Sequence, residues 1–210
     1  MIRQLLERKI TIQRFKLPCT QEQATDLLTA AYRSEVAFRG RNYIHDSQLV
    51  QHIASLAKFM TDCGSKFGVL LCGTYGNGKT TLLYALRSVV SMLANGGYLD
   101  GHTAIKIYDA RHIAKLYRDR DPKVFEDVCN ERLLAIEDLG KEPTESLDYG
   151  NVISPVVELL EQRYMSQRFT AITTNLTPKE IREKYGNRIA DRCNEMMCVI
   201  NFGAAKTFRI

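Results

Sequence analysis

The residues with the clearest chemical meaning form the glycine-rich segment G-T-Y-G-N-G-K-T at 73–80. It fits the spacing G-x-x-x-x-G-K-[ST] at every specified position, with a short apolar run before it and a helical pattern after it. Glycines let a loop turn its N–H groups around phosphate oxygens, and a helix N-terminus adds partial positive charge. We expect Lys79 to reach the β- and γ-phosphates of a nucleotide and the Thr80 hydroxyl to bind Mg²⁺. The predicted nucleotide-binding residues of this segment are Gly73, Thr74, Tyr75, Gly76, Asn77, Gly78, Lys79, Thr80 and Thr81.

Two adjacent acids end the apolar run R-L-L-A-I-E-D-L-G at 132–140. The pattern predicts a buried strand over 133–137 with Glu137 and Asp138 at its tip. A strand beside a phosphate loop can offer a carboxylate to the metal, usually through water. We therefore expect Glu137 to serve the Mg²⁺ shell and Asp138 to polarise an attacking water as general base. The alternative is that the Asp only caps the segment that follows.

A polar strand end is also predicted at T-T-N, residues 173–175, after the apolar run F-T-A-I-T. Asn175 could orient the attacking water or contact the γ-phosphate, although Asn at a strand end is often only a turn residue. At the end of the chain, Arg209 in T-F-R could fold back over the nucleotide. The alternative for Arg209 is a frayed terminus.

Two arginines stand four residues apart in Y-G-N-R-I-A-D-R-C at 185–193, so Arg188 and Arg192 share one helix face. One of them could act as an arginine finger that reaches the γ-phosphate in a neighbouring subunit and neutralises charge in the transition state. The alternative is a surface ion pair with Asp191.

These residues must be positioned by a fold, and the sequence predicts one in which strands alternate with helices. Helix starts are indicated by Thr20 and Asp46 as N-caps, by Asp109 as a cap, and by Pro122 and Pro178 at first helical positions. Such alternation predicts a parallel sheet with helices on both faces. Helices are expected over residues 21–38, 47–61, 78–94, 110–118, 122–131, 151–166, from 178 onward and 187–195, and strands over 67–72, 105–108, 133–137, 169–173 and 197–202.

The fold class is therefore predicted to be α/β, with a five-stranded parallel sheet flanked by helices. We expect residues 1–45 to form a short, mildly basic helical extension, with a first short helix over 2–9, and residues 46–210 to form the nucleotide-binding domain. The charge is uneven, because residues 1–66 hold 10 Lys and Arg against 6 Asp and Glu, and the remainder holds 19 against 18.

Composition excludes several classes of protein. Hydrophobic residues make up 45% of the 210, and no apolar run approaches the roughly 20 residues of a membrane span. The first ten residues mix charges into apolar positions and do not resemble a secretory signal, so a cytoplasmic protein without membrane contact is expected. The six cysteines form no C-x-x-C pair, and we expect them to be reduced and mostly buried.

The net charge of +5 is compatible with nucleic-acid contact. The candidate DNA-binding residues are Arg111, Lys115 and Arg118, which fall at helical spacing with Tyr117 nearby for stacking. An ordinary solvated helix face explains the same residues equally well.

The order of these motifs resembles that of the DnaC/IstB family of AAA+ ATPases, which includes bacterial replicative helicase loaders and the ATP-binding helper proteins of transposases. The resemblance covers residues 45–210 and rests on the phosphate loop followed by L-L-A-I-E-D-L-G-K-E, E-Q-R-Y, T-A-I-T-T-N-L, R-I-A-D-R and T-F-R. It implies a P-loop NTPase fold of the AAA+ (ASCE) type, with ATP and Mg²⁺ as cofactors. It also implies assembly into a ring or spiral on DNA, and single-stranded DNA is the expected form.

By this resemblance, Lys79 and Thr80 belong to the Walker A motif and Glu137 and Asp138 to Walker B. Asn175 is then sensor 1, Arg192 or Arg188 the finger, and Arg209 sensor 2. The sequence departs from the family in having Glu137 where the first Walker B acid is usually Asp, which predicts slow hydrolysis. The N-terminal part is also short and lacks a zinc-binding cysteine cluster.

The expected function is that of an ATPase that loads or remodels a DNA-bound partner such as a replicative helicase. The first alternative is a transposition helper ATPase acting with a transposase. The second is an ATP-switched DNA-binding scaffold with little turnover, which Glu137 motivates. The third is a P-loop small-molecule kinase, which would need an arginine-rich lid.

Overall fold

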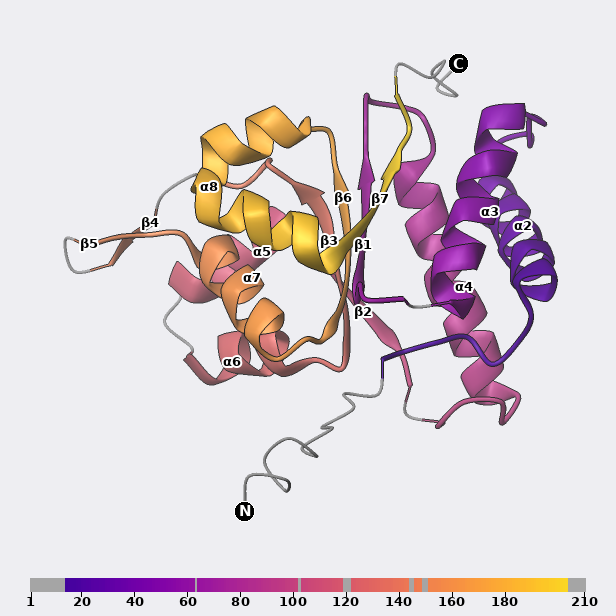
Figure 1. Cartoon of the computed structure of the whole chain (residues 1–210), viewed down its shortest axis with the longest axis horizontal. Coiled ribbons are helices and arrows are strands. Elements are labelled where there is room, and N and C mark those ends of the chain that lie inside the picture. The colour runs from indigo at the N-terminus through magenta and orange to yellow at the C-terminus, as the bar shows by residue number, and fades with distance from the viewer. Residues whose placement is uncertain are drawn as a thin grey trace, which may run out of the picture.

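The centre of the protein is a five-stranded parallel sheet with strand order β2-β3-β6-β1-β7 (Figure 1). The structure is a computed structural model and describes residues 14–62, 64–101, 103–118, 122–143, 146–148 and 151–203. All four pairings between neighbouring strands are parallel, which confirms the predicted sheet. The strands are β1 (Gly68–Cys72), β2 (Ile105–Asp109), β3 (Leu133–Leu139), β6 (Phe169–Thr174) and β7 (Met197–Asn201).

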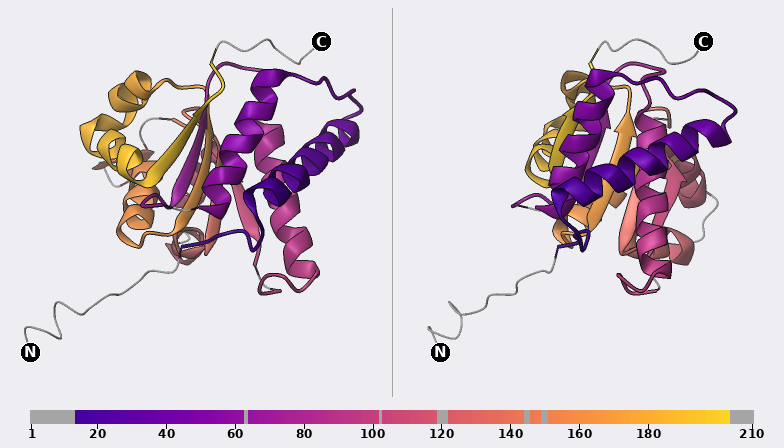
Figure 2. Two further views of the ribbon diagram at one scale, coloured as in Figure 1. Left: turned by 45° about the vertical axis from the view of Figure 1, so that its right-hand side comes forward. Right: turned by 90° about the vertical axis from the view of Figure 1, so that its right-hand side faces the viewer.

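Helices cover both faces of the sheet and give a three-layer architecture (Figure 1). Helices α2 (Gln21–Phe38), α3 (Ser47–Thr61) and α4 (Lys79–Asn95) lie on one face. On the other face lie α5 (Ala110–Arg118), α6 (Pro122–Asn130), α7 (Pro155–Met165) and α8 (Pro178–Met196). Helix α2 crosses α3 and α4 on the side turned away from the sheet (Figure 2).

Most helices begin where the sequence predicts. The Thr20 side chain accepts a hydrogen bond from the Gln23 amide, and the Gln23 side chain accepts one from the Thr20 amide, which completes a capping box. Thr177 and Glu180 form the same arrangement at the start of α8. Asp46 caps α3 by accepting from two amides of its first turn. These predictions are confirmed.

Helix α2 shares one hydrophobic core with the sheet. Its buried Leu28 and Tyr32 belong to the same cluster as Leu83 and Leu86 of α4 and Val69 of β1. Residues 21–38 therefore pack against the nucleotide-binding domain predicted for residues 46–210. The division of the chain at residue 45 stays a prediction, and the helix expected over residues 2–9 lies outside the described part.

The prediction of a helix over residues 151–166 was wrong for its first turn. Residues Asn151–Ile153 form strand β5, which pairs antiparallel with β4 (Ser146–Asp148), and the helix begins only at Pro155. The residue before a proline is driven out of the helical region, so Ser154 is extended and serves as N-cap. The proline then occupies the first helical position, where its missing N–H is not needed.

Helix α8 combines the segment from Pro178 and the helix predicted over residues 187–195. Gly186 lies between them with φ 84° and ψ 166°, a non-helical conformation that kinks the element. This backbone region is essentially restricted to glycine. The kink therefore sets the direction of the turns that carry Arg188 and Arg192.

Candidate nucleotide-binding site

A cavity of about 440 Å³ opens at the carboxyl ends of the central strands, the edge where open α/β sheets bind their ligands. It brings together residues of the phosphate loop, the acid pair, Asn175 and helix α2, which lie far apart in sequence. The lining residues predicted from the sequence are Tyr75, Gly76, Asn77, Gly78, Lys79, Thr80, Thr81, Glu137, Asp138 and Asn175.

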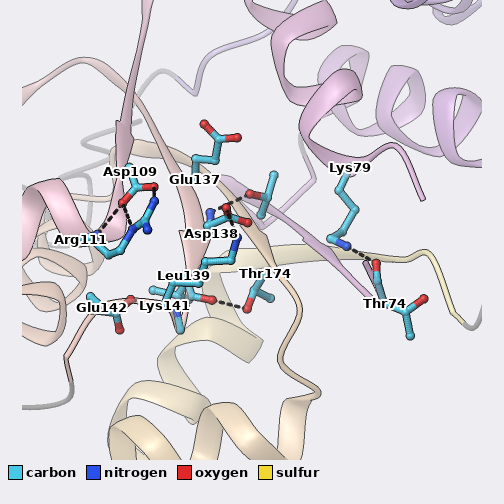
Figure 3. Close-up of polar contacts among 12 residues, drawn as sticks. Thr74, Lys79, Asp109, Arg111, Glu137, Asp138, Leu139, Lys141, Glu142 and Thr174 are labelled. Carbon is cyan, nitrogen blue, oxygen red and sulfur yellow. Dashed lines mark hydrogen bonds and ion pairs between the residues drawn. The ribbon is translucent and has the colours of Figure 1, made fainter. Parts of the chain in front are cut away.

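The Lys79 ammonium is buried and points back into its own loop. It donates hydrogen bonds to the carbonyl oxygen of Gly73 at 2.8 Å and to Oδ1 of Asn77 at 3.0 Å. A third hydrogen bond, of 2.6 Å, goes to the Thr74 carbonyl oxygen (Figure 3). Asn77 is also buried, and among the described residues its Nδ2 has no hydrogen-bond acceptor. A buried ammonium and a buried donor with no acceptor among the described residues are groups that phosphate oxygens can satisfy.

Position 78 has no room for a side chain, because helix α2 lies against it. Gly78 has a left-handed φ of 89°, and a Cβ placed on it would lie 2.3 Å from the Tyr32 hydroxyl. Burial, with the nearby Tyr43 as a smaller cause, raises the pKa of Tyr32 to about 12. A neutral phenol from α2 therefore supports the turn between the loop and α4.

The two adjacent acids both line the cavity because β3 contains a bulge. Consecutive residues of a regular strand point to opposite faces, so a straight strand would aim only one carboxylate at the cavity. In the pairing of β3 with β6, three residue steps from Ile136 to Leu139 match two steps from Ile172 to Thr174. Asp138 takes φ 59°, which is tolerated by Asp, and turns toward the same cavity as Glu137.

The strand was predicted to end at Glu137, and this was wrong because the bulge lets pairing continue to Leu139. Two threonines of β6 satisfy the backbone groups at the irregularity. The Asp138 amide donates to Oγ1 of Thr173 at 3.0 Å, and Oγ1 of Thr174 donates to the Leu139 carbonyl at 2.6 Å (Figure 3). The threonines of T-T-N therefore hold the bulge, and the following Asn175 lines the cavity.

Each acid has a partner within the chain. Oε2 of Glu137 accepts a hydrogen bond of 3.2 Å from the Tyr84 hydroxyl of α4. Burial raises the pKa of Tyr84, and the Glu137 carboxylate raises it further. Oδ2 of Asp138 accepts from the Lys141 ammonium at 2.5 Å (Figure 3).

Beyond Asp138, a buried polar cluster fixes the turn that follows the acid pair. Oε2 of the buried Glu142 accepts from the Gly140 amide at 2.9 Å, and its Oε1 accepts from the Tyr185 hydroxyl. The Lys184 ammonium donates to the carbonyls of Gly140 and Glu142 at 2.6 and 2.9 Å. The turn is thus attached to α8 directly before its kink at Gly186.

The two arginines proposed as fingers do not line this cavity in the described part of the chain. Nε of Arg188 and Nη1 of Arg192 approach Oε1 of Glu161 on α7 at 3.1 and 2.9 Å. Their side chains are 70% and 16% exposed, and the Arg192 guanidinium lies over the Tyr164 ring. Asp191, the partner expected from the sequence, pairs instead with Arg182.

Two of the candidate DNA-binding residues on α5, Arg111 and Lys115, lie on the surface. The Arg111 guanidinium donates to both carboxylate oxygens of Asp109, which holds the pKa of Asp109 below its usual value. Lys115 is exposed. The side chain of Arg118 and all of Arg209 lie outside the described residues, so their predicted roles are neither supported nor contradicted.

Sequence reasoning missed the part of the cavity that α2 and the following loop contribute, and it missed Tyr84 and Lys141. Lys141 stands three residues after Asp138 in the D-L-G-K-E block, so an i+3 turn could have indicated it. No local pattern indicates the others, because they come from helices and from the loop after α2, and the packing of both depends on the whole fold. The unpredicted lining residues include Tyr32, Val36, Arg39, Arg41, Asn42, Tyr43, Ile44, Leu49 and Lys141.

The residues present fit a magnesium–nucleoside triphosphate. The loop offers a buried cation and glycine turns, and Thr80, Glu137 and Asp138 line the same cavity. Mg²⁺ usually takes one or two carboxylates together with phosphate oxygens and water, which matches this donor set. The described helices include none that is long and apolar enough to cross a membrane.

No protein-family model and no curated protein matches the sequence. Solved structures do resemble the fold. The DnaC helicase loader is 19% identical over 76% of this chain and 92% of its own, with a TM-score of 0.59, and DnaI is 17% identical over 82% and 93%, with a TM-score of 0.57. The replication initiator DnaA bound to AMPPCP and single-stranded DNA is 15% identical over 75% and 48%, with a TM-score of 0.54. The protein therefore shares the fold of these structures, which confirms the predicted α/β fold class and supports the resemblance at the level of the fold.

Proposed function

We propose that this AAA+-fold protein binds and hydrolyses ATP, assembles on DNA, and loads or remodels a partner such as a replicative helicase. The observation that carries the proposal is a single cavity lined by the phosphate loop, the Glu137–Asp138 pair and Asn175. The likeness of the fold to a helicase loader and to a DNA-bound replication initiator supports the same class of function.

In this proposal each lining residue has a separate task. Lys79 exchanges its loop acceptors for the β- and γ-phosphate oxygens, and Thr80 and Glu137 hold Mg²⁺, which supplies neutralising charge at those oxygens. Asp138 polarises the attacking water, and Asn175 orients it. Asp138 suits the role of base because the bulge aims its carboxylate into the cavity beside Glu137.

The first test replaces Lys79 with alanine. We expect Lys79→Ala to abolish measurable binding of a fluorescent ATP analogue and to remove phosphate release, with and without single-stranded DNA. Lys179→Ala is a matched control, because Lys179 is an exposed lysine whose partner is Glu183 on the surface of α8. If the wild type does not bind ATP, or if Lys79→Ala keeps its binding and turnover, the proposed function is wrong.

The partners are part of the proposal. Arg188 or Arg192 would act on a neighbouring subunit in a ring or spiral, Arg209 would cover the nucleotide, and Arg111, Lys115 and Arg118 would contact DNA. A pull-down with a non-hydrolysable ATP analogue separates the two family roles. Recovery of a replicative helicase supports the loader, and recovery of a transposase supports the transposition helper.

A second function, an ATP-switched DNA-binding scaffold with little turnover, is favoured by the partners of the two acids. Glu137 is the longer acid at the metal position and is bonded to Tyr84, and Asp138 is paired with Lys141. Both contacts would have to change before hydrolysis. Brisk wild-type turnover, comparable to that of Glu137→Asp, would rule out the scaffold.

A further inference from the structure

Lys141 is a cation at the cavity to which neither the motifs nor the proposed catalytic roles give a task. Its Nζ lies 2.5 Å from Oδ2 of Asp138 and 5.9 Å from the centre of the Tyr75 ring of the phosphate loop. It lines the same cavity as Lys79, Thr80 and Asn175. It therefore lies between the proposed general base and the loop that would hold the phosphates.

The backbone that carries Lys141 is fixed, and its side chain is not buried. The Lys141 amide donates to the Asp138 carbonyl at 3.1 Å and closes a turn. Gly140 inside this turn has φ 105°, and a Cβ there would lie 2.7 Å from Leu176. Glu142 and Lys184 anchor the turn from the other side. The Lys141 side chain itself is 39% exposed, so its ammonium on a four-carbon stem can change partner without movement of the backbone.

The ion pair between Lys141 and Asp138 is open to water, because the two side chains are 39% and 24% exposed. An exposed ion pair between Lys and a carboxylate contributes little, because water screens the attraction and ordering two side chains costs entropy. A terminal phosphate carries more charge and more acceptor oxygens than one carboxylate. A phosphate placed beside Lys79 and Thr80 would therefore compete well for the Lys141 ammonium.

We propose that Lys141 is a phosphate-sensing residue that pairs with Asp138 in the free protein and transfers its ammonium to the terminal phosphate of a bound nucleoside triphosphate. The transfer leaves the Asp138 carboxylate free to polarise water only when a triphosphate is present. A diphosphate lacks the oxygens that draw Lys141 away, so the Asp138–Lys141 pair persists with ADP. This inference rests on the proposed function and adds discrimination between triphosphate and diphosphate.

The test compares dissociation constants for ADP and for a non-hydrolysable ATP analogue, measured by titration calorimetry in the presence of Mg²⁺. We expect Lys141→Met to lower the preference for the triphosphate about tenfold, the effect of one lost charge-assisted contact, and to change ADP affinity by less than about twofold. Lys141→Arg should keep most of the preference, and Lys179→Met should keep all of it. An unchanged preference in Lys141→Met overturns the proposal and leaves Lys141 as a surface ion pair.

A second variant tests the exchange itself and does not depend on turnover. Asp138→Asn removes the carboxylate that competes for Lys141. In a chain that keeps Lys141, it should therefore strengthen binding of the ATP analogue relative to ADP. In the Lys141→Met background, the same substitution should change this preference less. Equal effects in both backgrounds contradict the exchange. If the wild type does not bind the nucleotide, or if Lys79→Ala binds it normally, the proposed function is wrong. The failure of this inference and the failure of the proposed function therefore give different results.

Discussion

At the scale of single residues, the unusual feature is the acid pair Glu137–Asp138. A regular strand could present only one of them, and the bulge at Asp138 presents both. Glu137 stands where a shorter acid is usual in the family that the sequence resembles. Its carboxylate accepts a hydrogen bond from the Tyr84 hydroxyl. Under the proposed function, we expect the length of this side chain to limit the rate of hydrolysis.

We predict that Glu137→Asp hydrolyses ATP faster than the wild type, by roughly tenfold, the equivalent of about 1.4 kcal/mol in the barrier. The shorter side chain loses the Tyr84 bond and brings the carboxylate to the position of the usual acid. Phosphate release under saturating ATP measures the change. Glu126→Asp, an exposed position on α6, is the control. A wild-type rate equal to or above that of Glu137→Asp contradicts the prediction.

At the scale of elements, the buried Arg163 of the E-Q-R-Y segment joins three elements. From α7 its guanidinium donates to the carbonyls of Cys129 and Glu131 at the end of α6 and to Oγ1 of Thr170 in β6 at 3.0, 2.8 and 2.7 Å. It also donates to the Phe169 carbonyl. These partners are neutral, and burial lowers the pKa of Arg163 to about 10.

We predict that Arg163→Met lowers the free energy of unfolding by roughly 3–5 kcal/mol, because it leaves several buried carbonyl oxygens unpaired. Arg163→Lys should recover only part of this, since an ammonium cannot reproduce the planar fork of donors. Urea denaturation measures the change. Arg182→Met, an exposed arginine of α8, should cost about 0.5 kcal/mol or less. A loss of similar size in both methionine variants would show that the Arg163 contacts contribute little.

Other cations at the amino end of the strands have a similar role. Lys66 donates to the carbonyls of Asn194 and Met197 at the end of α8, and Arg168 donates to the Asn130 carbonyl at the end of α6. Helix C-termini carry partial negative charge, so these cations stabilise the helix ends. Part of the basic character that suggested nucleic-acid contact is thus used within the fold.

At the scale of the whole molecule, the nucleotide cavity and the two candidate finger arginines occupy different surfaces. Arg188 and Arg192 meet Glu161 in the groove between α7 and α8, and neither lines the cavity in the described part of the chain. For Arg188 or Arg192 to act on the phosphates, it would therefore have to come from a neighbouring molecule. Arg188 is much the more exposed of the two.

We predict that Arg188→Ala and Arg192→Ala bind ATP as the wild type does, and that the variant lacking the finger loses about 100-fold or more in turnover. Mixing that variant with Lys79→Ala should restore turnover, because Lys79→Ala subunits supply the arginine and the arginine variant supplies the nucleotide site. Phosphate release from equimolar mixtures measures this. A mixture that gives no more than the sum of its parts contradicts action between subunits.

The phosphate loop, the helix caps at Thr20 and Asp46 and most of the helices and strands could be predicted from the sequence. These features depend on residues close together in the chain, whose spacing and backbone preferences act locally, and the alternation of strands with helices then predicted the parallel sheet. The same locality explains why Lys79, Thr80 and both acids could be selected as site residues before their positions were known.

Three features of the site became visible only in the folded protein. Two adjacent acids face one cavity, and Tyr32 of α2 supports the phosphate loop. Arg188 and Arg192 pair with Glu161 and not with Asp191. The bulge depends on Thr173 and Thr174, some 35 residues away in the chain. Such contacts are chosen by the packing of whole elements, because many partners satisfy a local pattern equally well. Packing density and the need to pair every buried polar group then select one arrangement.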